Sequence, residues 1–199
     1  MSRVRTVDER RTTILDAAIA VLARDGIAET TTRKIAAEAS VNQAMLRYYF
    51  GSKDDLLFAV LQEMMRQTRE VVQRATLSGQ DLRAMLLEGL LGFWQHFESR
   101  PELQVLQYEL TLYALRNPTS AWLAREQYDG YCAVVETLFA EGLAATSQSS
   151  AVSLPELARF VVAGIDGLIL QFISAPDPTR ARRDLANLVS AVVALAEGQ

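Results

Sequence analysis

Residues 30–53 read TTTRKIAAEASVNQAMLRYYFGSK, and this stretch decides the fold. Its pattern predicts two short helices, over about residues 32–39 and 43–49, with a break at residues 40–42 between them. The small side chains of Ala36 and Ala37 let two helices cross closely. Two short helices joined by a three-residue turn have the dimensions of a helix-turn-helix.

The residue types of this stretch divide into an inner and an outer set. The inward residues that would lock the helices together are Ile35, Ala39, Val41 and Leu46. Asn42 is expected to cap the second helix. The outward groups there are Gln43, Ala44 and Arg47, flanked by Tyr48 and Tyr49. Polar, small and aromatic groups of this kind suit contacts with base edges and phosphates. An ordinary helical hairpin with a solvated polar face fits the same pattern.

Residues 14–56 resemble the DNA-binding domain of TetR-type repressors. The residues that carry the resemblance are Ile14-Leu15-Asp16-Ala17-Ala18, Gly26, Thr30-Thr31 before Ile35-Ala36, and residues 41–50 closed by Ser52-Lys53-Asp54-Asp55-Leu56. The resemblance implies a three-helix DNA-binding head, over residues 1–52, on a six-helix ligand-binding and dimer-forming body, over residues 53–199.

The resemblance also implies roles for single residues. It places Arg33 and the segment Gln43–Arg47, including Ala44, at the major groove, and Thr31, Tyr48, Tyr49 and Lys53 at phosphates. The sequence departs from the family's commonest pattern at Ser40, where glycine is usual in the turn, and at Arg47, where an aromatic residue is frequent. Arg47 could contact a guanine or a phosphate, and the sequence leaves both open.

The rest of the chain predicts further helices, nine in all, and an all-α fold. Helix-start signals stand at Thr6 with Glu9, Ser52 with Asp55, Ser78 with Asp81, Asn117 with Pro118, Ser153 with Glu156, and Asp177 with Pro178. Gly26 is expected to stop the first helix.

Composition and charge favour a cytoplasmic protein with a DNA partner. Half of the 199 residues are hydrophobic, and Cys132 is the only cysteine, which suits a reducing compartment. The net charge is −4, but residues 1–53 carry nine basic and six acidic side chains, a net of +3. No secretory signal is evident, and the most apolar stretch, residues 160–173, is interrupted by Asp166 and is too short to span a bilayer. We therefore expect no membrane partner.

No enzymatic site can be assembled from the sequence. His96 is the only histidine, and no second cysteine is available to form a metal site with Cys132. His96 is expected to be solvated or hydrogen-bonded within the structure. We expect neither a catalytic residue nor a metal nor a cofactor.

The sequence of the body predicts a small-molecule pocket and a dimer interface. The candidate pocket residues are Phe93, Trp94, Phe97, Tyr108, Tyr113, Trp122, Tyr128, Tyr131 and Asp166. Most such aromatics are core residues, but this number of amphipathic rings suggests an apolar pocket for an apolar or aromatic effector. Asp166 and Gln171 are candidates for polar handles of this pocket or for cross-dimer hydrogen bonds, and Asp166 could instead bond a backbone group. The candidate interface residues are Ala163, Gly164, Gly167, Leu185, Leu188, Val189 and Val192, for which an internal core is the alternative.

The function predicted from these features is a ligand-responsive repressor, a homodimer on a palindromic operator. An all-helical small-molecule-binding protein, or a DNA-binding activator with a similar head, would fit much of the same sequence.

Overall fold

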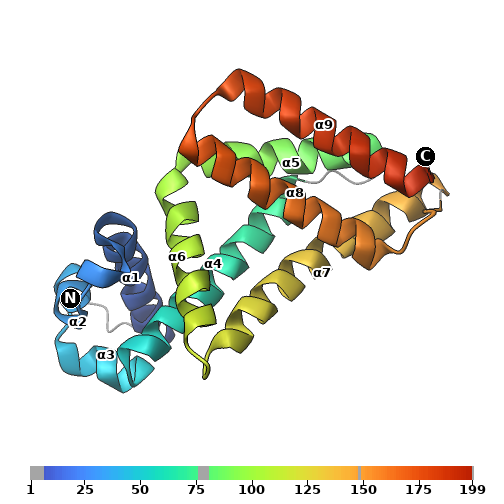
Figure 1. The fold of residues 1–199 in the computed structure, drawn as a ribbon. Helices are drawn as coiled ribbons and strands as arrows, with labels where there is room; N and C mark the ends of the chain where they lie inside the picture. Colours follow the sequence, from blue (N-terminus) through green and yellow to red (C-terminus); the bar gives the residue numbers. More distant parts are fainter. Residues whose placement is uncertain (1–6, 76–80, 148, 199) are drawn as a thin grey trace, which may run out of the picture. The chain divides into compact units, whose positions relative to one another are not determined.

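The structure, a computed structural model, describes residues 7–75, 81–147 and 149–198. Of the residues in these ranges, 87% are helical; they form nine helices, and no strand occurs among them. The helices are α1 (Val7–Glu29), α2 (Thr32–Glu38), α3 (Gln43–Phe50), α4 (Lys53–Ala75), α5 (Leu82–Ser99), α6 (Pro101–Arg116), α7 (Ala121–Thr146), α8 (Leu154–Ser174) and α9 (Pro178–Glu197) (Figure 1). The all-α prediction is confirmed.

The helices group into two compact units. Unit 1 comprises Met1–Arg66 and Arg100–Arg125, and unit 2 comprises Gln67–Ser99 and Glu126–Gln199. Unit 1 therefore holds α1, α2, α3 and α6 whole, together with the first parts of α4 and α7. This grouping describes packing; the functional division after residue 52 stays a prediction.

The core of unit 1 forms where α1 packs against α2 and α6. Apolar residues recur along α1 at helical spacing, so one of its faces can be buried along its length. The fully buried side chains of this core include Ile14, Leu22, Ile35, Leu56, Leu61, Leu106 and Leu123. Burying a side chain of this size contributes about 1.5–3 kcal/mol, so this core holds α2 firmly against α1.

Gly26 interrupts α1 with a kink, at the residue where the sequence predicts that the helix stops. Its backbone has φ 75° and ψ 167°, a conformation that is available essentially to glycine alone. Helical structure resumes after it and runs to Glu29, three residues further than the expected stop. The hydroxyl of Thr30, which is 1% exposed, donates to the carbonyl of Gly26 at 2.7 Å and holds the bend.

The core of unit 2 forms where α9 packs against both α5 and α8. The apolar stripe of α9 turns inward there, and Leu185, Val189 and Val192 are at most 1% exposed. Glycine permits the close approach of α8 and α9, because a Cβ at Gly164 would lie 2.5 Å from a methyl carbon of Leu188.

The helix-start signals meet different outcomes. Ser52 and Asp55 form a reciprocal capping box, with Asp55 N donating to Ser52 Oγ at 3.0 Å and Ser52 N to Asp55 Oδ2 at 3.1 Å. Asp177 accepts from Arg180 N at 3.0 Å and caps α9. Thr6 and Ser78 lie outside the described residues, although Asp81 accepts from Ala84 N at 2.8 Å.

Two of these expectations are wrong. The helix expected from Pro118 begins at Ala121, because Asn117 Oδ1 accepts from the amide and hydroxyl of Thr119 and turns the chain first. Ser153 stands at the start of α8 as predicted but makes no side-chain capping bond there.

Helix α8 is the most apolar long helix of the described residues. By length and composition alone it could cross a bilayer, because its most apolar window has a mean hydropathy of 1.6. The helix, Leu154–Ser174, is longer than the apolar stretch 160–173, which by itself is too short to span a bilayer. Only 33% of that window is buried within the chain. A core helix of a soluble protein meets the same criterion.

Candidate nucleic-acid interface

The turn between α2 and α3 is held by caps at both helix starts. Thr31 Oγ1 accepts from Lys34 N at 3.2 Å, and Asn42 Oδ1 accepts from Met45 N at 2.9 Å, as predicted for Asn42. Ser40 lies between them with φ 54°, the left-handed region in which glycine is favoured. The turn closes through Val41 N, which donates to Ala36 O at 2.9 Å.

The inner residues pack as expected, except that Val41 is only half-buried. Ile35, Ala39 and Leu46 are 1%, 7% and 3% exposed. Burial on this side fixes which side of α3 faces solvent.

The outer face of α3 is open to solvent. Gln43, Ala44, Arg47 and Tyr48 are exposed, and Tyr48 reaches 79%. Tyr49 is half-buried and stacks edge-on against Tyr48, with ring centroids 5.2 Å apart. Arg33 and Thr31 on the neighbouring α2 side are exposed as well. The Tyr48 ring thus contacts Tyr49 on one edge and is otherwise open to solvent.

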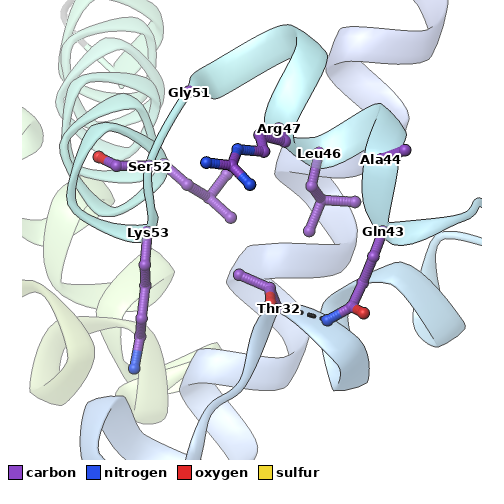
Figure 2. A pocket seen from close by; sticks show the side chains of 9 residues that line it. Thr32, Gln43, Ala44, Leu46, Arg47, Gly51, Ser52 and Lys53 are labelled. Atoms are coloured by element: carbon purple, nitrogen blue, oxygen red, sulfur yellow. Dashed lines mark hydrogen bonds between the residues drawn. The ribbon is translucent and has the colours of Figure 1, made fainter.

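A hollow of about 390 Å³ lies beside this face. Its lining residues are Thr32, Gln43, Ala44, Leu46, Arg47, Gly51, Ser52, Lys53 and Leu56. Figure 2 shows Gln43 held by a hydrogen bond from Nε2 to Thr32 Oγ1, 3.0 Å long, and Arg47 extending into the hollow towards Ser52. Arg47 and the first residue of α4, Lys53, thus line the same hollow.

Lys53 is already bonded within the chain. Its Nζ donates to Thr30 O at 2.7 Å and to Ile27 O at 3.2 Å, and in Figure 2 it points away from Arg47. An ammonium group has three donors, so one remains for a phosphate. Sequence spacing gave no signal for these bonds, because Lys53 is 23 and 26 residues from its acceptors.

Charged contacts join the helices of the head. Lys34 Nζ and Arg24 Nε each lie 2.9 Å from the carboxylate of Asp25, and their hydrogen bonds hold the pKa of Asp25 below its usual value. The guanidinium carbon of Arg11 lies 5.3 Å from the ring centroid of Phe50, the last residue of α3. None of these contacts was predicted from the sequence.

Tyr113 and Asp54 join α6 to the first turn of α4 within unit 1. The hydroxyl of Tyr113 donates to Asp54 Oδ1 at 2.8 Å. This bond, followed by partial burial, raises the pKa of Tyr113 above its usual value of 10.0. Tyr113 was predicted as a pocket residue, and its hydroxyl is instead engaged with α4.

The other predicted pocket residues divide between the two units. Tyr108 and Trp122 belong to unit 1, where Trp122 is 54% exposed. Trp94 and Phe97 of α5 are buried in unit 2 and form an aromatic cluster with Phe172 of α8, a residue that no sequence pattern pointed to. Phe93, Tyr128, Tyr131 and Asp166 are half-buried residues of unit 2.

The predicted interface residues also divide. Leu185, Val189 and Val192 are buried inside unit 2, so they offer no surface to a partner; their helix stripe covers α5 and α8 of the same chain. Gly164 and Leu188 contact each other. Ala163 is exposed, and a Cβ at Gly167 would meet no atom within 4 Å.

Among the described residues, no group of three or more histidine, cysteine, aspartate or glutamate side chains could hold a metal ion. His96 is exposed in the last turn of α5, and burial raises the pKa of Cys132.

Comparison with known proteins covers both parts of the chain. Residues 14–60 match the family profile described as bacterial regulatory proteins, tetR family, and residues 78–195 match the tetracyclin repressor-like C-terminal domain. A nicotine-responsive transcriptional repressor of Paenarthrobacter nicotinovorans, HdnoR, is 33% identical over 190 residues, which are 95% of this chain and 96% of the relative.

Solved structures give the same picture. The multidrug binding protein EbrR complexed with ethidium is 31% identical, with a TM-score of 0.67 over 90% of this chain and 98% of that one. A regulator from Haloarcula marismortui, 20% identical, shares the fold with a TM-score of 0.74 over 96% and 98% of the two chains. The chain belongs to the TetR family of bacterial transcriptional regulators.

Proposed function

We propose that this chain is a repressor that binds a palindromic operator as a homodimer and is released by a small-molecule effector bound in its body. The head, residues 1–52, binds DNA, and residues 53–199 bind the effector and form the dimer. We place the protein in the bacterial cytoplasm, where the chromosome lies.

The exposed face of α3 is the observation that carries this proposal. Ala44, Arg47 and Tyr48 are solvent-exposed on a helix whose opposite side is locked into a core, beside a hollow that Arg47 enters. A helix of this kind fits the major groove with its N-terminal residues, here Gln43 and Ala44, nearest the bases. Tyr48, Tyr49 and Thr31 surround it with groups that can bond phosphate oxygens.

The dimer follows from the geometry of operator recognition and from α8. One head reads a half-site, and a two-fold axis places a second head one helical turn along the DNA. The exposed side of α8 carries Phe160, Ala163, Gly167 and Leu170, of which Phe160 is 43% and Leu170 51% exposed. Small and apolar residues on an uncovered helix face suit close packing against the same face of a second copy.

The effector acts by shifting a population. A ligand that binds one spacing of the heads better than another moves the equilibrium by its differential affinity. HdnoR is named as nicotine-responsive, and EbrR was solved with ethidium; we propose a small organic effector for this chain as well.

The test is a footprint and a binding titration on the DNA adjoining the chain's own gene. We expect a compact palindromic footprint, strong salt dependence, and loss of binding in the triple variant Arg33→Ala, Tyr48→Ala, Lys53→Ala. Arg182→Ala, an exposed arginine of α9, is the matched control and should bind as the wild type does.

The absence of sequence-preferring, salt-sensitive binding would overturn the repressor proposal. A protected site that raises transcription in a reporter would make the chain an activator, and broad coverage without a palindrome would make it an architectural protein.

A further inference from the structure

Three side chains of unit 2 form a polar and aromatic cluster that the head does not use. Tyr128 of α7 donates its hydroxyl to the carboxylate of Asp166 in α8. The ring of Tyr131, one turn further along α7, lies edge-on to Tyr128, with centroids 6.4 Å apart. The hydroxyl oxygen of Tyr131 is buried beside Thr68 of α4 and Gln127 of α7, and Gln127 is 1% exposed. Three helices of one unit thus meet at this cluster.

Asp166 is unusual for its position. It is the only acidic residue of α8 beyond the first turn, and the helix around it is apolar enough to pass a length-and-composition test for a membrane span. A half-buried carboxylate in such surroundings is costly unless its oxygens are bonded. The phenol of Tyr128 is one hydrogen-bond partner of this carboxylate.

The negative charge of Asp166 reaches both rings. It adds to the effect of burial in raising the pKa of Tyr128 and of Tyr131. Both phenols therefore stay neutral at physiological pH, and their rings keep the electron-rich faces that attract cations.

We propose that Tyr128, Tyr131 and Asp166 bind an organic cation, a protonated amine or a quaternary ammonium on an apolar body. The inference rests on the proposed effector site in the body and specifies its chemistry. Two aromatic rings and a carboxylate are the partners that an ammonium group prefers. An anionic ligand meets like charge there, and a neutral one lacks the charge–charge attraction to Asp166. The predicted apolar or aromatic effector is thereby revised to one that also carries positive charge.

The cluster also contacts α4, the helix that follows the predicted DNA-binding head in the chain. Thr68, which faces Tyr131, lies on α4, and α4 begins at Lys53 with the capping box that closes the head. A ligand that contacts Tyr131 would therefore lie beside α4, the helix that begins at residue 53.

The test compares two probes of the same shape and different charge on the full-length protein. Phenyltrimethylammonium carries a cationic nitrogen where tert-butylbenzene carries a neutral carbon. Binding is measured by isothermal titration and by the shift of the thermal midpoint, for the wild type, Asp166→Asn and Asp166→Glu. Glu156→Gln, an exposed acid in the first turn of the same helix, is the matched control.

We expect the ammonium probe to bind the wild type and Glu156→Gln alike, and Asp166→Asn roughly tenfold or more weakly. Asp166→Glu should recover part of the loss, which excludes a purely structural effect of the substitution. The neutral probe should bind wild type and Asp166→Asn with equal, weak affinity.

The inference is overturned if Asp166→Asn binds the ammonium probe as tightly as the wild type, if the neutral probe binds as well as the cation, or if no saturation occurs up to roughly 10 mM. Operator binding, measured in the same preparations, distinguishes failure of the cation proposal from failure of the repressor proposal. A chain that binds its operator but ignores the cation is a repressor with a different effector, whereas a chain that binds the cation but no DNA is not a repressor.

Discussion

Ser40 shows how one residue can keep a costly backbone conformation for the sake of the turn it completes. Its φ of 54° is disfavoured for every residue with a Cβ, yet Val41 N can reach Ala36 O only if the chain turns there. Arg47 is a second residue that departs from the family's usual pattern, and the hollow gives it a direction that sequence alone could not.

Ser40→Gly is expected to stabilise the protein by about 0.5–1 kcal/mol, because glycine removes the left-handed penalty but adds unfolded-state entropy. Urea unfolding at a fixed chain concentration measures this. Ala37→Gly, an exposed helical site in α2, is the control and should lose about as much. Equal destabilisation by both substitutions would contradict the strain argument.

Arg47→Ala is expected to weaken DNA binding through a lost phosphate contact, because Arg47 extends towards Ser52 at the start of α4. The slope of log affinity against log salt should fall by about one, with specific and nonspecific DNA affected in parallel. Titration at several salt concentrations checks this. A loss confined to one operator base pair, of about 1–3 kcal/mol, would instead make Arg47 a base-reading residue.

At the scale of helices, the sequence predicted those features that depend on neighbours along the chain. The caps at Asn42 and Asp177 and an interruption of α1 at Gly26 were predicted, because a cap or a glycine with positive φ acts within four residues, although α1 resumes after Gly26 instead of stopping there. The hydrogen bonds of Lys53 and Tyr113 were not predicted, because their partners come from distant segments of the chain. The stripe of α9 has a clear period, but periodicity does not say whether it faces its own core or a partner.

The bond between Tyr113 of α6 and Asp54 of α4 predicts an alkaline effect on stability. The folded-state pKa of Tyr113 is raised above 10.0, so folding favours the protonated phenol. Its stabilisation is fully present below pH 10 and is lost as pH rises through the raised value.

Tyr113→Phe should therefore cost about 0.5–1.5 kcal/mol at neutral pH and make the decline of stability above pH 10 shallower. Unfolding free energies measured from pH 8 upward by denaturant titration check both effects. The slope should not vanish, because the pKa values of Tyr128 and Tyr131 are raised too. An unchanged alkaline slope in the variant would show that Tyr113 does not contribute.

At the scale of the whole molecule, the exposed apolar side of α8 is where the proposed second copy would pack. Only 33% of its most apolar window is buried by its own chain, and Phe160 and Leu170 are 43% and 51% exposed. A second copy would remove this surface from water.

Leu170→Glu is expected to shift the protein towards monomers, because it places a charge in the proposed interface and removes about 0.8–1.5 kcal/mol of apolar burial per side chain, Leu170 being 51% exposed in one chain. Light scattering after size-exclusion chromatography reports the mass. Leu112→Glu, on α6 and equally exposed at 56%, is the control and should leave the dimer intact. Monomers from the control with dimers from Leu170→Glu would move the interface to α6.

The bend at Gly26 has a consequence for genetics. Because its φ and ψ suit no other residue, every missense change of that codon should damage the head regardless of the size of the new side chain. A selection for constitutive expression of the regulated gene should therefore recover many different alleles at codon 26. Gly167 differs, because a Cβ there would meet no atom of its own chain within 4 Å. At codon 167 the same selection should therefore recover only large or charged replacements, which would disturb the proposed dimer interface on α8.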